Sequence, residues 1–148
     1  RTFSKIYALA SLRIGWAFCP LTIADVLNRI RAPFNLSTAS QMAGKAAVED
    51  VGHVAAARDH NLVWLPWLRD RLTECGLMVY PSAANFLLVR FPNDVAHNSQ
   101  AAMAFFSRKG LILRETGIYG LPECLRVTVG KEEAMKALVV NAKEFMAK

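Results

Sequence analysis

The chain has 148 residues, of which 53% are hydrophobic and 20% are charged, and its formal net charge is +6. This balance excludes a disordered chain and favours a packed globular protein, because enough apolar surface is present to build a core. No apolar run reaches the roughly 18 residues that span a membrane, and the opening lacks the basic start and apolar core of a signal peptide. We therefore expect a cytoplasmic protein without a membrane partner, and because the first residue is Arg1 we allow for a missing upstream segment.

The positive charge does not indicate a nucleic-acid partner. The 18 lysines and arginines are scattered along the chain, whereas binding to a phosphate backbone favours a clustered stripe. Isolated arginines suit small anions such as phosphates and carboxylates better. The cysteines and histidines show no metal-ligand or short disulfide spacing, so we expect reduced thiols and no metal site. These residues are Cys19, Cys75, Cys124, His53, His60 and His97.

The first part of the chain contains one predicted strand and one predicted helix. The run "RIGWAFCP", residues 13–20, is short, apolar and closed by a proline, which is typical of a buried strand. A helix is expected over about residues 22–31, with Thr22 as its N-cap and apolar residues on one face. Pro33 follows this helix and would end it.

Two further helices are expected in the middle of the chain. Thr38 and Gln41 have the spacing of a capping box, which predicts a helix from residue 38 to about residue 49. Apolar residues then recur at helical spacing over residues 53–74, and Gly76 closes this long amphipathic element.

The character of the sequence changes after residue 76 to short strands and turns. We expect strands in "LMVY", "NFLLVRF", "LILRE" and "CLRVTV", and helices over residues 99–109 and 131–146. The resulting order of strands, helix, strands and helix indicates an α+β layer with its helices on one face of a sheet.

A lysine with notable neighbours lies near the start of the chain. In "TFSKIYALASLRIGW", residues 2–16, Lys5 directly follows Ser4 in a mostly apolar stretch, and Arg13 comes shortly afterwards. Desolvation by apolar neighbours and a nearby cation would both favour the neutral amine, which can react with a carbonyl group. The alternative is an ordinary lysine at the edge of a core, with its ammonium group in water.

Two arginines occur in the predicted strands near the end of the chain. Alternation in "CLRVTV" places Arg126 on the same face as Thr128. An arginine on a strand is a rigid donor of paired hydrogen bonds, which suits carboxylate recognition. Arg114, at the end of "LILR", offers the same chemistry. The alternative for both residues is an exposed arginine on a sheet face.

Several segments together resemble one enzyme family. Ser4 and Lys5 followed by "LASLRIGW" resemble the lysine segment of pyridoxal-phosphate-dependent aminotransferases of fold type I. The segments "RTFSK", "RAPFNLSTA", "ANFLLVRF", "GLILRETGIYGLP" and "LRVTVGKEEA" resemble histidinol-phosphate aminotransferases, in order and over nearly the whole chain. The resemblance implies an α/β fold, the C-terminal part of a fold type I transferase. Residues 1–36 would be the tail of the large cofactor-binding domain, residues 37–75 the connecting helices, and residues 76–148 a small α+β domain.

The resemblance also implies roles for the residues singled out above. Lys5 would be the catalytic lysine that holds pyridoxal 5'-phosphate covalently. Ser4 and Arg13 would bind the phosphate group of this cofactor. Arg126 would bind the substrate carboxylate, and Arg114 would be an anion contact for the phosphate of the substrate itself.

Two positions depart from the commonest pattern of the family. Ala8 and Ser11 stand where glycine is frequent. Both residues are small, so the tight path after the lysine should be kept, although a left-handed backbone at either position would cost more than it does for glycine.

The implied reaction is the transamination of L-histidinol phosphate with 2-oxoglutarate, a step of histidine biosynthesis. Family members are typically homodimers, and in them the acid, the aromatic ring and the backbone loop that also hold the cofactor precede the lysine segment. We therefore expect the 148-residue chain to be inactive alone. The alternatives are another fold type I enzyme, such as an aromatic aminotransferase or a phosphothreonine decarboxylase, and a noncatalytic α+β assembly module.

Overall fold

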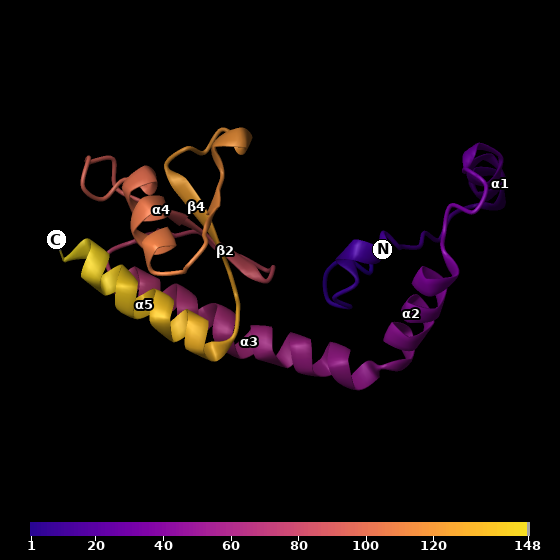
Figure 1. Ribbon diagram of the computed structural model, residues 1–148, viewed down its shortest axis with the longest axis horizontal. Coiled ribbons are helices and arrows are strands. Elements are labelled where there is room, and N and C mark those ends of the chain that lie inside the picture. The colour runs from indigo at the N-terminus through magenta and orange to yellow at the C-terminus, as the bar shows by residue number, and fades with distance from the viewer. Residues whose placement is uncertain (148) are drawn as a thin grey trace. The chain divides into compact units, whose positions relative to one another are not determined.

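The computed structural model describes residues 1–147, and the chain divides into two compact units, Arg1–Asp59 and His60 onward. The boundary lies inside the longest helix, whereas the boundaries implied by the resemblance lie at residues 36 and 75. None of the helices within residues 1–147 is both long enough and apolar enough to cross a membrane. In chain order the elements are η1 (Ala10–Leu12), α1 (Leu21–Ile30), α2 (Thr38–Glu49), α3 (Val51–Glu74), β1 (Met78–Val79), β2 (Phe86–Arg90), α4 (Ser99–Arg108), β3 (Arg114–Glu115), η2 (Gly117–Tyr119), β4 (Cys124–Thr128) and α5 (Glu132–Met146), most of them labelled in Figure 1.

The opening of the chain forms a loop instead of the strand predicted over residues 13–20. Its only ladder contact among the described residues is an isolated antiparallel bridge between Thr2 and Gly15. Phe3 and Ile14 are buried, but Phe18 is 97% exposed. The strand prediction is wrong for the described chain, because an apolar run becomes a strand only where neighbouring backbone extends the hydrogen-bond ladder.

The N-cap of α1 lies two residues before the predicted cap, and that of α2 lies one residue before it. Pro20 occupies the N-cap position of α1, so Thr22 already lies in the first turn. For α2 the N-cap is Ser37, whose side chain accepts a hydrogen bond of 3.1 Å from the backbone N–H of Ser40. Ser37 has the extended backbone that an N-cap needs, whereas Thr38 is already helical. The predicted capping box is therefore wrong, although the helix itself is confirmed.

A glycine in α2 lets the opening loop approach this helix closely. A Cβ atom at Gly44 would lie 2.9 Å from Cδ1 of Ile14 and 4.0 Å from Cε1 of Phe3. Nearby, the buried hydroxyl of Ser40 donates a hydrogen bond of 3.0 Å to the carbonyl oxygen of Leu12. The small core of the first unit therefore depends on the absence of a side chain at Gly44, which leaves room for Ile14 and Phe3.

We expect Gly44→Val to destabilise the first unit by about 2 kcal/mol, because a branched side chain would overpack against Ile14 and Phe3. The matched control is Gly52→Val in α3, where the nearest atom to an added Cβ is Asp50 Oδ1 at 3.6 Å. Urea unfolding followed by circular dichroism would measure both changes. Equal effects of the two substitutions would contradict the packing argument.

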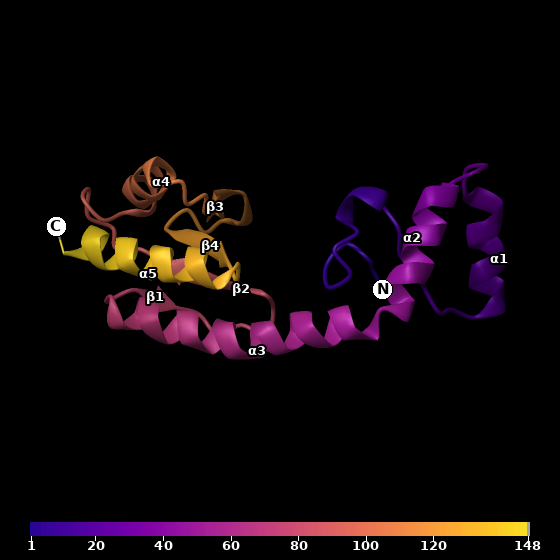
Figure 2. The same cartoon turned by 60° about the horizontal axis from the view of Figure 1, so that its bottom comes forward.

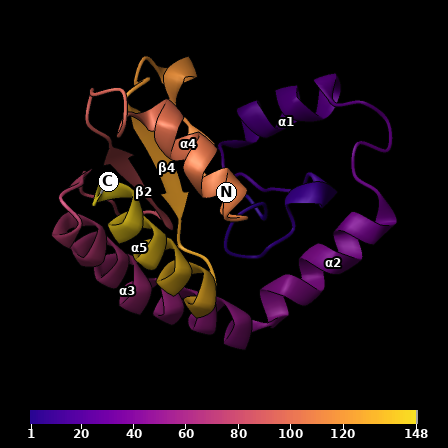
Figure 3. The same ribbon diagram turned by 60° about the vertical axis from the view of Figure 1, so that its left-hand side comes forward.

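The second unit is built on a four-stranded antiparallel sheet with the order β1-β2-β4-β3. Leu87 and Val89 of β2 pair with Val127 and Leu125 of β4, and all four side chains are buried. They share one core with side chains from α4, from α5 and from the C-terminal part of α3. Figures 2 and 3 show α5 beside this part of α3.

The predicted order of strands and helices in this unit is confirmed, as is an α+β arrangement with one buried sheet face. The strand predicted in "LILRE" is shorter than expected and consists of Arg114–Glu115. Thr128 is exposed and Arg126 is half-buried, while Leu125 and Val127 are buried, so the alternation predicted for β4 is confirmed.

Candidate functional site

The lysine near the start of the chain lies in a tight loop. The backbone N–H of Leu9 donates to the carbonyl oxygen of Phe3 at 3.0 Å, and that of Ala8 donates to the carbonyl oxygen of Lys5 at 2.9 Å. Ala8 closes the turn with φ +57°, the left-handed region that costs an L-residue roughly 1–2 kcal/mol. The left-handed backbone whose cost was predicted where glycine is frequent is therefore present at Ala8. Ser11, the other such position, lies in the 3-10 helix η1 and has no positive φ.

Ser4 and Arg13 are brought together beside Lys5. Arg13 Nη1 donates to the carbonyl oxygen of Ala10 at 2.7 Å and lies 3.5 Å from Ser4 Oγ. The side chain of Lys5 is exposed, and it makes no hydrogen bond or ion pair within residues 1–147. Of the two alternatives for Lys5, this exposure matches the lysine at the edge of a core, and the described residues do not enclose its side chain. The loop presents an amine, a hydroxyl and a guanidinium, which are donors suited to a phosphate and a carbonyl compound.

A histidine holds this loop from a distant part of the sequence. His53 Nε2 lies 3.1 Å from the carbonyl oxygen of Ile6, the residue after the lysine. The backbone N–H of His53 donates to Asp50 Oδ1 at 2.9 Å, which fixes the first turn of α3. The Asp50 cap could have been read from the sequence, but the contact with Ile6 spans 47 positions and has no local signal.

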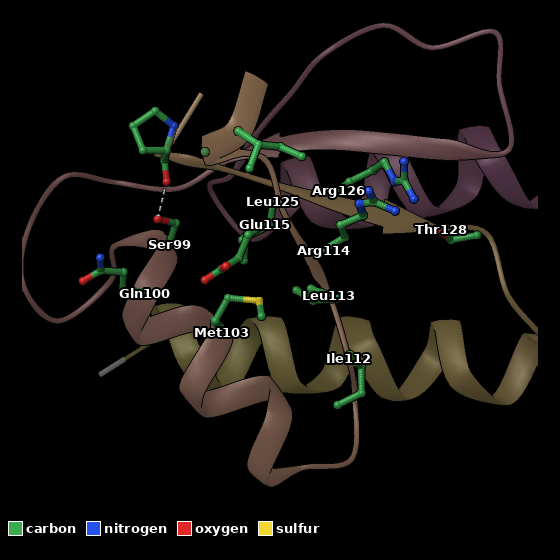
Figure 4. Close-up of a pocket in the computed structure, with 13 residues that line it drawn as sticks. Ser99, Gln100, Met103, Ile112, Leu113, Arg114, Glu115, Leu125, Arg126 and Thr128 are labelled. Carbon is green, nitrogen blue, oxygen red and sulfur yellow. Dashed lines mark hydrogen bonds between the residues drawn. The ribbon is translucent and has the colours of Figure 1, made fainter. Parts of the chain in front are cut away.

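The two strand arginines lie directly opposite each other in the second unit. Arg114 of β3 is the cross-strand partner of Arg126 of β4. Both line an open pocket of 920 Å³, together with Thr128 of β4, Met103 of α4 and others. Figure 4 shows the two guanidinium groups beside each other near Thr128. The structure therefore brings together the two arginines that sequence reasoning singled out separately.

These arginines have no acidic partner in the described chain. Within residues 1–147 the guanidinium groups of Arg114 and Arg126 make no hydrogen bond or ion pair. Glu115 also lines the pocket, but its carboxylate points away from the guanidinium groups in Figure 4. The pocket lining therefore carries two arginines and one glutamate, an excess of positive charge that suits an anion.

Two hydroxyl groups fix the loop that joins the strands of the arginines. The buried Thr116 Oγ1 lies 2.8 Å from the carbonyl oxygens of both Leu121 and Cys124. Ser99 Oγ, at the start of α4, donates to the carbonyl oxygen of Pro122 at 2.7 Å. The turn between β3 and β4 is therefore held from inside, which keeps the pocket wall in place.

The cysteines of this unit are not arranged as nucleophiles. Burial raises the pKa of the Cys124 thiol in β4, and the carboxylate of Glu123 raises it further. Burial also raises the pKa of Cys75. Both thiols are therefore protonated at neutral pH, whereas reactive cysteines are thiolates.

The lysine loop of the first unit presents an amine, a hydroxyl and a guanidinium, and the second unit presents an arginine pair at a pocket. Such groups suit carbonyl, phosphate and carboxylate ligands. The sequence matches the family described as aminotransferase class I and II over residues 1–141. The chain belongs to this family.

Two curated relatives and one solved structure define the similarity more narrowly. The histidinol-phosphate aminotransferases of Paramagnetospirillum magneticum and Nitrobacter winogradskyi are 49% and 48% identical, each over 99% of this chain and 40% of its own length. The crystal structure of histidinol-phosphate aminotransferase from Sinorhizobium meliloti in complex with pyridoxal-5'-phosphate is 27% identical. It has a TM-score of 0.83 over 99% of this chain and 40% of that one. The chain thus spans about 40% of the length of the curated relatives it matches.

Proposed function

We propose that the protein is a pyridoxal-phosphate-dependent histidinol-phosphate aminotransferase, in which this chain supplies the catalytic lysine and the small domain. The observation that carries the proposal is the identity of 46–49% with histidinol-phosphate aminotransferases over 99% of the chain. We further propose that the enzyme acts in the cytoplasm as a homodimer, with 2-oxoglutarate as the amino-group acceptor.

The residues around Lys5 fit the proposed cofactor. A phosphate group accepts hydrogen bonds from hydroxyl and guanidinium donors, and Ser4 Oγ and Arg13 Nη1 lie 3.5 Å apart. A cofactor aldehyde needs an accessible amine, and the adjacent Lys5 is exposed. When bound, pyridoxal phosphate supplies a carbonyl carbon that exchanges amines and a ring that takes up an electron pair.

The chain's own residues would then divide the remaining work. Lys5 Nζ would remove a proton from the substrate carbon that bears the amino group and would return a proton during the exchange. Arg126 would orient the carboxylate of glutamate or 2-oxoglutarate, because its guanidinium lines the pocket without an acidic partner. Arg114, directly opposite, would bind the phosphate of histidinol phosphate.

A chimera tests this proposal. In the chimera, this chain replaces the matching 40% of the Paramagnetospirillum magneticum enzyme, to which it is 49% identical. We expect the chimera to transfer the amino group of histidinol phosphate to 2-oxoglutarate, and the 148-residue chain alone to show no turnover, because it spans only part of its relatives. A coupled assay of glutamate formation measures both proteins.

The substrate panel makes the test specific. It includes phenylalanine, assayed by glutamate formation, and phosphothreonine, assayed by release of carbon dioxide, for the other fold type I activities considered above. A chimera that folds and binds the cofactor but prefers one of these substrates would overturn the proposed substrate. Turnover by the chain alone would overturn its proposed dependence on a further cofactor-binding part.

A further inference from the structure

An aromatic ring lies against the arginine that we propose as the carboxylate ligand. The guanidinium carbon of Arg126 is 5.0 Å from the centroid of the Phe86 ring, which is within the distance at which a cation is attracted to a ring face. The residues come from adjacent antiparallel strands, where Phe86 pairs with Thr128 and Leu88 pairs with Arg126. Phe86 and Arg126 are therefore diagonal neighbours on one face of the sheet.

The surroundings of Arg126 require a support of this kind. Its direct cross-strand partner is Arg114, and like charges in opposite positions repel each other. Within residues 1–147 neither guanidinium forms an ion pair with a carboxylate, and Arg126 Nε is buried without a hydrogen-bond acceptor. A guanidinium on a flexible side chain would turn toward water under these conditions, because it would regain hydration and increase its distance from Arg114.

We propose that Phe86 is a positioning residue that holds the guanidinium of Arg126 against the sheet, ready to receive a substrate carboxylate. The inference rests on the proposed function, because it assumes that Arg126 binds that carboxylate. The ring attracts the cation through its face, but it takes up no hydrogen bond of the two Nη groups. The Nη groups of Arg126 therefore remain free to donate hydrogen bonds to an anion. Because the ring already holds the Arg126 side chain in place, this side chain loses less conformational freedom when the anion binds.

Phe86 positions Arg126 through the negative π face of its ring and not through its apolar volume alone. Phe86 is half-buried beside the core strand positions Leu87 and Val89, so leucine at this position would keep an apolar group there but would offer no quadrupole. Tyrosine would keep the ring. Phenylalanine fluorinated at three ring positions would keep the shape of the ring but withdraw the negative charge from its face.

The test measures carboxylate binding by the 148-residue chain, without cofactor or turnover. The Nε–H signal of Arg126 and the backbone amide signals of β3 and β4 are followed by NMR while glutarate, a dicarboxylate, is added. Arg126→Gln identifies the Nε–H signal, and the amide signals report glutarate binding in that variant. We expect the ring of Phe86 to shift this signal upfield in the unliganded chain. We expect Phe86→Leu and trifluorophenylalanine at position 86 to raise the dissociation constant for glutarate about fivefold, and Phe86→Tyr to restore it to within about twofold.

The outcomes separate this inference from the proposed function. Unchanged binding in the fluorinated protein and in Phe86→Leu, together with loss of binding in Arg126→Gln, would overturn the positioning role and leave Arg126 as the ligand. Glutarate binding that is absent from the unchanged chain, or that survives Arg126→Gln, would overturn the role of Arg126 and the inference with it. The fluorinated protein decides the question even where Phe86→Leu fails to fold, because its ring has nearly the natural shape.

Discussion

Lys5→Arg in the chimera is expected to lower turnover at least about a thousandfold. Arginine keeps the positive charge of the exposed lysine, but a guanidinium is not deprotonated in proteins. It can therefore neither bond to the cofactor carbonyl nor accept a proton from the substrate. Steady-state assays and single-turnover spectra would measure the loss.

A chemical readout accompanies this kinetic prediction. Borohydride reduction of the chimera with pyridoxal phosphate, followed by peptide mapping, should find the modified side chain at Lys5 and no modification at this position in Lys5→Arg. The matched control is Lys45→Arg, whose side chain is exposed on α2 and only 3.9 Å from Glu49 in an ion pair. An adduct on another lysine, or full activity of Lys5→Arg, would show that Lys5 is not the catalytic residue.

The second unit could largely be predicted from the sequence because its core is made of its own side chains. Leu87 and Val89 alternate with more exposed residues along β2. Leu125 and Val127 do the same over residues 125–128 of β4, although Cys124 before them is also buried. Such a pattern predicts the structure well when the buried side chains pack against residues of the same unit. For the same reason the side-chain direction of Arg126 followed from alternation, and its pairing with Arg114 needed only the strand register.

The first unit shows where this reasoning fails. The run that includes Trp16 and Phe18 looks like a buried strand, yet both side chains are exposed in the described chain. The hydrophobic pattern of a segment indicates only that its side chains can be buried. The segment becomes a β-strand when another segment pairs with it through backbone hydrogen bonds. The contacts of His53 with Ile6 and of Phe86 with Arg126 were missed for a related reason, since each joins positions about 40 or more apart and neither has a local spacing rule.

Arg126→Gln in the chimera is expected to lower kcat/KM for 2-oxoglutarate about a hundredfold, because a carboxylate would lose a charged donor of two hydrogen bonds. Arg126→Lys should recover only a small part of this loss, since an ammonium group has no fork that matches both carboxylate oxygens. Arg114→Gln should instead raise KM for histidinol phosphate, whose phosphate it is proposed to bind. Kinetics in which each substrate is varied separately would measure the three effects.

The comparison between the two arginines makes the prediction specific. They face one pocket from paired strand positions, so a general loss of positive charge would affect both substrates alike in either variant. A direct contact would affect one substrate more than the other. Arg108→Gln is the matched control, because Arg108 ends α4 and is exposed outside the pocket lining. Equal losses for both substrates in Arg126→Gln and Arg114→Gln would show that the pocket attracts anions by charge alone, and separate losses would establish that each guanidinium recognises its own anion.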